Sequence, residues 1–225
     1  MNNFNFTKPS TATYLTSTAT YPGYLYTTPT TQVPPPATLA PKLYPNASKI
    51  LDNLWLGDEK SSQDENFLRS NNIRVIVNCT KELPNIFTPF YINPQLHANY
   101  FKDAFLEYAR VEVEESENVA NQEQLFNQLP RLVQFIDQKL TTEAKPVLIH
   151  CNTGKQRSAT VMAAYIYFKY HSTNNCTMEQ VIDHMKKQRP AVFNYGYKFS
   201  FRKTLDQFLI SYNTQLQQHR RQELL

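Results

Sequence analysis

A continuously apolar run that leads into a glycine loop and an apolar helix is the strongest constraint on the fold of this chain. The run 146–150 is apolar up to its final residue, His150, which is typical of a strand buried on both faces of a sheet. A tight loop containing Gly154 follows. The stretch 158–171 is then apolar nearly all round and predicts a buried helix. A buried strand that passes directly into a covered helix indicates an α/β fold.

Further strand and helix patterns alternate along the chain. Short β-branched or alternating runs predict strands at 73–78 and 108–113. Pro130 is expected to kink the helix predicted over 121–140 or to start a new helix there. The alternation predicts an α/β domain with a central, mostly parallel sheet flanked by helices. The helical patterns cover residues 60–71, 121–140, 158–171, 177–188 and 197–217.

Residues 1–45 differ in composition from the rest of the chain. They hold 8 of the 14 prolines, 11 threonines and no acidic residue. Because their apolar residues show no period of 2 or 3.6, this Thr/Pro/Tyr-rich segment is predicted to be a disordered tail. We expect one globular domain over 46–218 and a short C-terminal tail over 219–225.

The overall composition limits the function classes. No run of about 20 apolar residues is present, so we expect no membrane span. The net charge of +4 suits a phosphorylated ligand but is too small to argue for nucleic acid. The three cysteines argue against a disulfide framework and predict a reducing, cytoplasmic compartment. The histidines are scattered without metal-ligand spacing, so we expect neither a metal nor a cofactor.

Residues 150–158 carry the strongest chemical signal, with the sequence His-Cys-Asn-Thr-Gly-Lys-Gln-Arg-Ser. Ligands bind at the carboxyl ends of parallel strands, and loop N–H groups together with a helix N-terminus cradle anions such as phosphate. The same groups stabilise a thiolate, so Cys151 is placed for in-line attack on phosphorus. Arg157 opens the helix and can offer two parallel donors to phosphate oxygens.

This run matches the His-Cys-x5-Arg-Ser signature of the protein tyrosine phosphatase superfamily, and the serine after the arginine resembles its dual-specificity branch. The resemblance covers about 46–210. Ile50–Gly57 is similar to the family's opening strand, Ile73–Thr80 to its asparagine-bearing strand, and Arg189-Pro190 to its closing segment. The resemblance implies a cysteine-phosphatase fold. It also implies hydrolysis of phosphotyrosine and phosphoserine or phosphothreonine in proteins through a phosphocysteine intermediate.

The resemblance implies a role for each residue of the signature. Cys151 would be the nucleophile, Arg157 would stabilise the transferring phosphoryl group, and Ser158 would hydrogen-bond the sulfur and help it leave. His150 and Asn78 would support the loop. The residues implied to bind the phosphate are Asn152, Thr153, Gly154, Lys155, Gln156 and Arg157.

The general acid departs from the family pattern. The family uses an Asp in the loop after the strand that resembles 108–113, but this chain has no Asp between Asp103 and Asp137. Counting forward from that strand places the acid at Glu115, whereas counting back from Asp137 places it nearer Glu117. A Glu can make the same proton transfer. We predict Glu115, with Glu117 as the competitor and Asp103 as the next candidate.

Other functions stay open. Lys155 adds positive charge to the loop, as in the phosphoinositide and phosphatidylglycerophosphate phosphatases of the superfamily, so phospholipid head groups are an alternative substrate. The missing Asp would suit a phosphate-binding pseudophosphatase, although Cys151 and Arg157 are both present. An RNA 5′-triphosphatase is disfavoured because Ser158 is not Thr and no basic stripe is present.

Cys79 has two interpretations. It could form a protective disulfide with Cys151, as resolving cysteines do. Because its neighbour Asn78 is expected to face the loop, strand alternation turns Cys79 away and favours a core cysteine.

Overall fold

The fold is described here from a computed structural model. The tail predicted at 1–45 lies, except for Pro45, outside the described residues, and its disorder stays a prediction. None of the helices in the described part of the chain is both long and apolar enough to cross a bilayer. The structure describes residues 45–87, 106–114, 116, 118–194 and 201–223.

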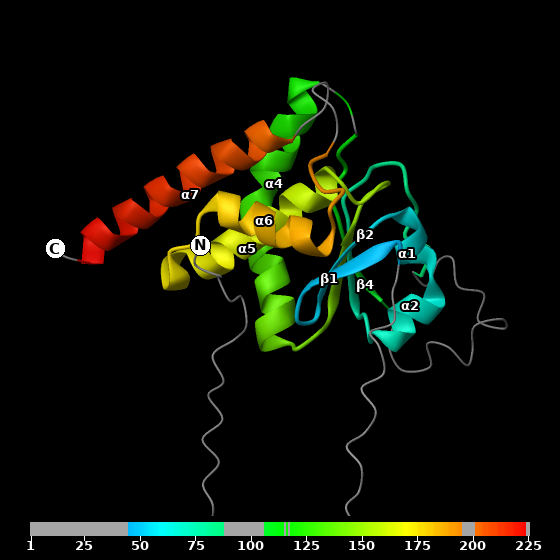
Figure 1. Cartoon of the computed structure of the whole chain (residues 1–225). Helices are drawn as coiled ribbons and strands as arrows, with labels where there is room; N and C mark the ends of the chain where they lie inside the picture. Colours follow the sequence, from blue (N-terminus) through cyan, green and yellow to red (C-terminus); the bar gives the residue numbers. More distant parts are fainter. Residues whose placement is uncertain (1–44, 88–105, 115, 117, 195–200, 224–225) are drawn as a thin grey trace, which may run out of the picture. The chain divides into compact units, whose positions relative to one another are not determined.

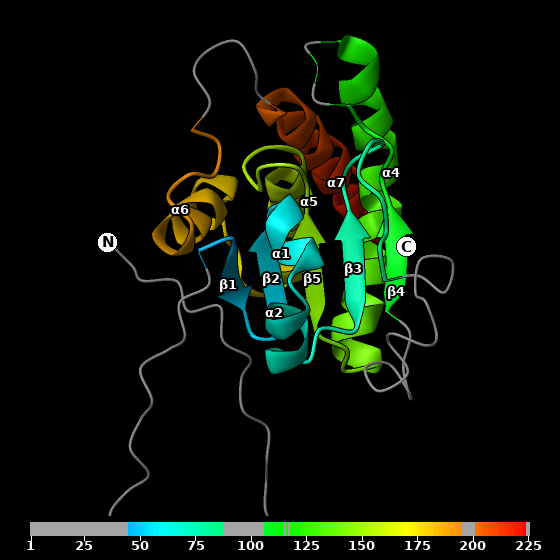
Figure 2. The ribbon, with the colours of Figure 1, turned by 90° about the vertical axis from the view of Figure 1, so that its right-hand side faces the viewer.

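A five-stranded sheet of order β1-β2-β5-β3-β4 forms the centre of the domain (Figure 2). The β1–β2 pairing is antiparallel, and the β2–β5, β5–β3 and β3–β4 pairings are parallel. The predicted mostly parallel sheet is therefore confirmed. The strands predicted at 73–78 and 108–113 are confirmed as β3 (Val75–Asn78) and β4 (Glu107–Arg110), although β4 ends sooner than expected. The strands are β1 (Ala47–Leu51), β2 (Leu54–Gly57), β3 (Val75–Asn78), β4 (Glu107–Arg110) and β5 (Val147–His150).

Helices cover both faces of this sheet, as predicted (Figures 1 and 2). The short helices α1 (Glu59–Gln63) and α2 (Glu65–Ser70) lie on one face. The longer helices α4 (Val119–Asp137), α5 (Arg157–Asn174) and α7 (Arg202–Glu223) lie on the other. The helix α6 (Met178–Gln188) packs beside β1, and the π-helix η1 (Gln138–Thr142) continues α4.

The strand β5 and the helix α5 form the middle of the core. Every residue of β5 is buried, as expected for a strand covered on both faces. Residues 157–167 of α5 are buried without exception, which confirms the helix predicted to be apolar all round. Because α5 packs on β5 and β2, the loop that joins β5 to α5 is held between two rigid elements.

Two predicted elements are divided in the structure. The segment Ile50–Gly57 spans the turn of a hairpin instead of one strand, with Asn53 at φ 60°, a left-handed conformation that Asn tolerates. The helix expected over 60–71 is two helices. The Asp64 carboxylate accepts a hydrogen bond from the Phe67 N–H and so caps the start of α2.

Helices run past two positions where the sequence suggested an end. Of the two outcomes expected at Pro130, a kink or a new helix, the new helix is not found, because Pro130 lies inside α4, which packs on α5 and α7. Residues 219–223 belong to α7, so the C-terminal tail predicted at 219–225 does not begin at 219. The helix α4 thus continues through Pro130, and the helix α7 continues to Glu223.

The buried strand gives a direct test of the core. Ile149 is fully buried in β5, whereas Ile210 on α7 is 70% exposed. We expect Ile149→Ala to lower the free energy of unfolding by about 2–5 kcal/mol, because it leaves a cavity in a packed core. Ile210→Ala is the matched control and should change it by less than about 0.5 kcal/mol. Equal effects in urea unfolding would contradict the assignment of β5 to the core.

Candidate active site

The candidate site lies at the carboxyl end of the two central strands. β5 ends at His150, whose register partner is Asn78, the last residue of β3. The loop 151–156 leads from β5 into α5, which begins at Arg157. Strand, loop and helix thus follow each other as the sequence predicts, at the sheet edge where α/β proteins bind ligands.

Four consecutive carbonyls of this loop are tied to the structure around it. Because the C=O and N–H of a trans peptide point in opposite directions, the N–H groups of residues 153–156 face the inside of the loop. Inward N–H groups at a helix N-terminus form a cradle for an anion. The carbonyl of Asn152 accepts from the Glu59 N–H (3.1 Å), those of Thr153 and Gly154 from the Arg189 guanidinium (3.2 and 3.0 Å), and that of Lys155 from the Phe193 N–H (3.0 Å).

Gly154 is required by the shape of the loop. Its φ of +67° is a conformation that side chains with a Cβ rarely adopt. A Cβ at this position would lie 2.5 Å from the Gly57 carbonyl oxygen and 2.8 Å from Nη2 of Arg189. The loop therefore packs against the end of β2 so closely that only glycine fits.

Cys151 lies at the base of the loop and is almost fully buried. The Ser158 hydroxyl, from the first turn of α5, donates a hydrogen bond to its Sγ at 3.1 Å. A hydroxyl in this position stabilises negative charge on the sulfur, which suits a thiolate that attacks and later leaves.

Arg157 is fully buried, and two of its acceptors lie in the described part of the chain. Its Nη1 donates to Oε1 of Glu82 at 3.0 Å and to the Val113 carbonyl at 2.8 Å. Glu82 belongs to the loop after β3, and Val113 to the segment after β4. Three chain segments therefore meet at this guanidinium.

His150 is buried beside the loop and is neutral at physiological pH. Burial lowers its pKa from 6.5 to about 4, opposed by a hydrogen bond with the Cys151 backbone and assisted by the positive charges of Arg110 and Arg157. The positive charge near the sulfur therefore comes from arginines. The supporting role of this buried, neutral imidazole stays a prediction.

Cys79 is a buried core cysteine. Burial raises the pKa of its thiol well above the usual value, and the nearby charge of Cys151 raises it further, against a smaller opposing effect of Arg157. A thiol that resists ionisation is a poor nucleophile. Cys79, Cys151 and Cys176 are all free and buried.

The candidate acids Glu115, Glu117 and Asp103 lie outside the described residues. The segment that leads to them is described. Its Val113 carbonyl contacts Arg157, and its Glu114 forms an ion pair of 2.9 Å with Lys81. The chain therefore enters the predicted acid segment next to the loop arginine.

Two residues of the site were not identified from the sequence. Glu82 has no motif around it, and its partner Arg157 is 75 residues away, so no local pattern could reveal it. In the sequence, Arg189 stands out only as part of the Arg-Pro segment. Its two hydrogen bonds to loop carbonyls depend on where the end of α6 lies in space.

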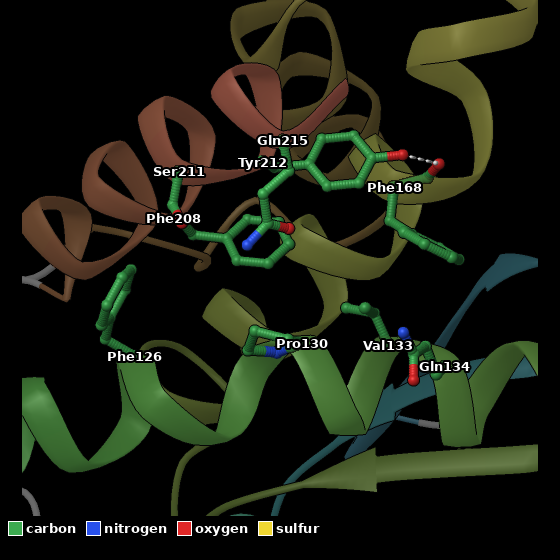
Figure 3. A pocket seen from close by; sticks show the side chains of 9 residues that line it. All are labelled: Phe126, Pro130, Val133, Gln134, Phe168, Phe208, Ser211, Tyr212 and Gln215. Atoms are coloured by element: carbon green, nitrogen blue, oxygen red, sulfur yellow. Dashed lines mark hydrogen bonds between the residues drawn. The ribbon is translucent and has the colours of Figure 1, made fainter. Parts of the chain in front are cut away.

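An apolar pocket of about 70 Å³ lies away from this loop, between α4, α5 and α7 (Figure 3). Tyr212 closes one side of it and donates a hydrogen bond to the Phe168 carbonyl at 3.4 Å. No residue of the loop lines this pocket, and its walls offer no charged side chain. Among the described residues, no group of three or more His, Cys, Asp or Glu side chains could hold a metal ion.

Comparisons with known proteins agree with this geometry. The family model for the dual specificity phosphatase catalytic domain matches residues 54–208. Human dual specificity protein phosphatase 9 is 29% identical over 160 residues, which cover 70% of this chain and 36% of the human protein. Protein phosphatase Slingshot of Drosophila melanogaster is 27% identical over 145 residues, covering 64% of this chain and 12% of Slingshot. The chain thus spans only a part of the length of either relative.

The fold also matches a solved structure. The crystal structure of human DUSP28 aligns with a TM-score of 0.56 at 16% identity, covering 76% of this chain and 97% of that one. At this identity the likeness shows the fold alone, and it agrees with the sheet and helices described above.

The conformation of Gly154 leads to a prediction on anion binding. Gly154→Ala should weaken binding of tungstate, a phosphate mimic, by roughly tenfold or more, because a strained backbone of about 1–3 kcal/mol must be accommodated or the cradle must open. Calorimetric titration measures this affinity. Gln217→Ala, at an exposed position of α7 outside the loop, is the control and should bind normally. Equal affinities for the two variants would contradict the cradle.

Proposed function

The chain belongs to the dual specificity phosphatase family, and from this premise we propose that it is a cysteine-dependent phosphatase. It hydrolyses phosphotyrosine and phosphoserine or phosphothreonine monoesters in protein substrates. The observation that carries the proposal is the loop 151–157, with its outward-tied carbonyls, a buried cysteine at its base and a buried arginine at its end. Such a loop offers an anion cradle and a nucleophile at one point.

In the first step Sγ of Cys151 attacks phosphorus while the phosphate oxygens lie in the cradle. The S–P bond forms, the P–O bond to the substrate breaks, and the departing oxygen takes a proton from a general acid. Arg157 and the N–H groups of residues 153–156 stabilise the charge on the transferring phosphoryl group. The products are the dephosphorylated side chain and a phosphocysteine.

In the second step water gives a proton to the carboxylate that the general acid has become, its oxygen bonds to phosphorus, and the S–P bond breaks. The thiolate of Cys151 is then the leaving group. The Ser158 hydroxyl, 3.1 Å from Sγ, stabilises the charge that returns to the sulfur. Inorganic phosphate leaves and the site is restored.

Charges near the loop favour protein over lipid substrates. Lys155 supports a phospholipid head group as the second candidate. Against it, the carboxylate of Glu82 is paired with Arg157 and that of Glu114 with Lys81, so both cations already have an anionic partner within the protein. A head group with several phosphates would have to compete with these carboxylates, whereas a single phosphate on a peptide needs only the loop. Comparing the turnover of a phosphopeptide with that of an inositol phosphate distinguishes the protein substrate from the phospholipid substrate.

The three unpaired, buried cysteines support an intracellular setting. Disulfides are rare and thiols stay reduced in the cytosol. We propose that the chain acts there on phosphoproteins.

The nucleophile can be tested by a single substitution. Cys151→Ser should abolish turnover of an aryl phosphate and of a phosphopeptide, because a hydroxyl is a far weaker nucleophile than a thiolate. Phosphopeptide binding should persist, which makes the variant a substrate trap. Cys176→Ser changes another buried cysteine and should keep its activity. Turnover by Cys151→Ser at the wild-type rate would refute the proposed mechanism.

The general acid can be identified by how the loss of rate in each Glu variant depends on the leaving group of the substrate. Glu115→Gln should slow phosphopeptide hydrolysis by roughly 100-fold or more, because a poor leaving oxygen needs a proton. Aryl phosphates with acidic phenols should be affected much less. Glu117→Gln is the matched control. If it alone shows this dependence, the acid is Glu117. If neither variant shows it, the assignment of the acid to this segment is wrong.

A further inference from the structure

The loop after β3 is held in a fixed shape by Asn78. The Asn78 Nδ2 donates to the Leu83 carbonyl at 3.0 Å and to Oδ1 of Asn85 at 2.8 Å. Its Oδ1 accepts from both the N–H (3.1 Å) and the hydroxyl (2.7 Å) of Thr80. One buried side chain therefore links the beginning and the end of this loop.

Arg110, the last residue of β4, holds the same loop from the neighbouring strand. Its Nη1 donates to the carbonyls of Thr80 and Lys81, at 2.9 and 3.2 Å. Its Nη2 donates to the Leu83 carbonyl at 2.7 Å and to Oδ1 of Asn85 at 2.9 Å. With both strands attached to it, the loop 80–85 is a rigid support.

The residue that this loop presents to the candidate active site is Glu82. Its carboxylate lies 3.0 Å from Nη1 of Arg157, and the Val113 carbonyl lies 2.8 Å from the same nitrogen. Nη1 carries two hydrogens, and these two acceptors account for both. The plane of the guanidinium is therefore fixed by two groups that belong to different loops.

We propose that Glu82 is a positioning residue, which orients the guanidinium of Arg157 for the phosphoryl group. This inference rests on the proposed function. An arginine binds phosphate best with two donors in one plane, and a small misplacement lowers the rate strongly. The carboxylate also compensates the burial of a charge that is completely shielded from water.

Two substitutions at Glu82 separate orientation from charge. Glu82→Gln and Glu82→Ala both remove the negative charge, but only the glutamine keeps an oxygen that can accept from Nη1. We expect Glu82→Ala to have a kcat/KM for an aryl phosphate roughly tenfold or more below that of Glu82→Gln, as for a hydrogen bond to a charged group. Glu112→Ala, an exposed carboxylate on the neighbouring segment, is the control and should resemble wild type.

A leaving-group series distinguishes positioning from acid catalysis. A misoriented Arg157 weakens the stabilisation of the phosphoryl group itself, so Glu82→Ala should slow all aryl phosphates by the same factor. A loss that grows as the leaving group becomes poorer would identify Glu82 as an acid and overturn the proposal. Equal kcat/KM for Glu82→Ala and Glu82→Gln would also overturn it.

A double-mutant cycle tests whether Glu82 acts through Arg157. The effect of Glu82→Ala should shrink to less than about threefold in an Arg157→Lys background, because a lysine has no guanidinium plane to orient. Fully additive effects would show that Glu82 acts in another way and would overturn the proposal.

Tungstate titration keeps this inference distinct from the proposed function. Glu82→Ala should bind tungstate roughly tenfold more weakly than Glu82→Gln, with both variants shown by circular dichroism to be folded at the temperature of the titration. If the wild-type protein turns over no phosphate ester, the proposed function fails, while this difference in affinity still supports the role of Glu82. Equal affinities overturn the inference whether or not the protein has phosphatase activity.

Discussion

The outward hydrogen bonds of the loop carbonyls are the interaction on which the candidate active site depends. A six-residue connection between a strand and a helix could take many shapes, and its N–H groups would point in as many directions. Here the backbone of α1, the guanidinium of Arg189 and the backbone of Phe193 each fix part of it. Because the carbonyls of residues 152–155 are held outside, the N–H groups of residues 153–156 are directed inside.

The parallel sheet explains why distant segments meet at this loop. Parallel strands end at one edge, so the connections after β3, β4 and β5 leave the sheet side by side. The loop after β3 brings Glu82, the segment after β4 brings Val113, and the loop after β5 brings Cys151. The long helices on one face and the short ones on the other keep this edge in place (Figures 1 and 2).

Burial determines which groups near the Cys151 sulfur carry a charge. Burial keeps His150 neutral and Cys79 protonated, because each would have to carry its charge away from water. Arg157 keeps its charge in the same surroundings, since a guanidinium is not deprotonated in proteins and has a carboxylate and a carbonyl as partners. The site therefore holds permanent positive charge close to Cys151, while His150 and Cys79 beside it stay uncharged.

The sequence by itself determined the α/β class, the buried strand at 146–150, the glycine loop and the buried helix that follows. These depend on local periodicity and on residue types at fixed spacing, which a single chain displays directly. It did not reveal the hairpin turn at Asn53, and it left open whether a new helix starts at Pro130, where α4 in fact continues. Only the tertiary structure decided which groups hold the loop, because Glu82 and Arg189 reach it across 75 and 35 residues. Contacts at such separations follow from strand order and helix placement, and no spacing in the sequence encodes them.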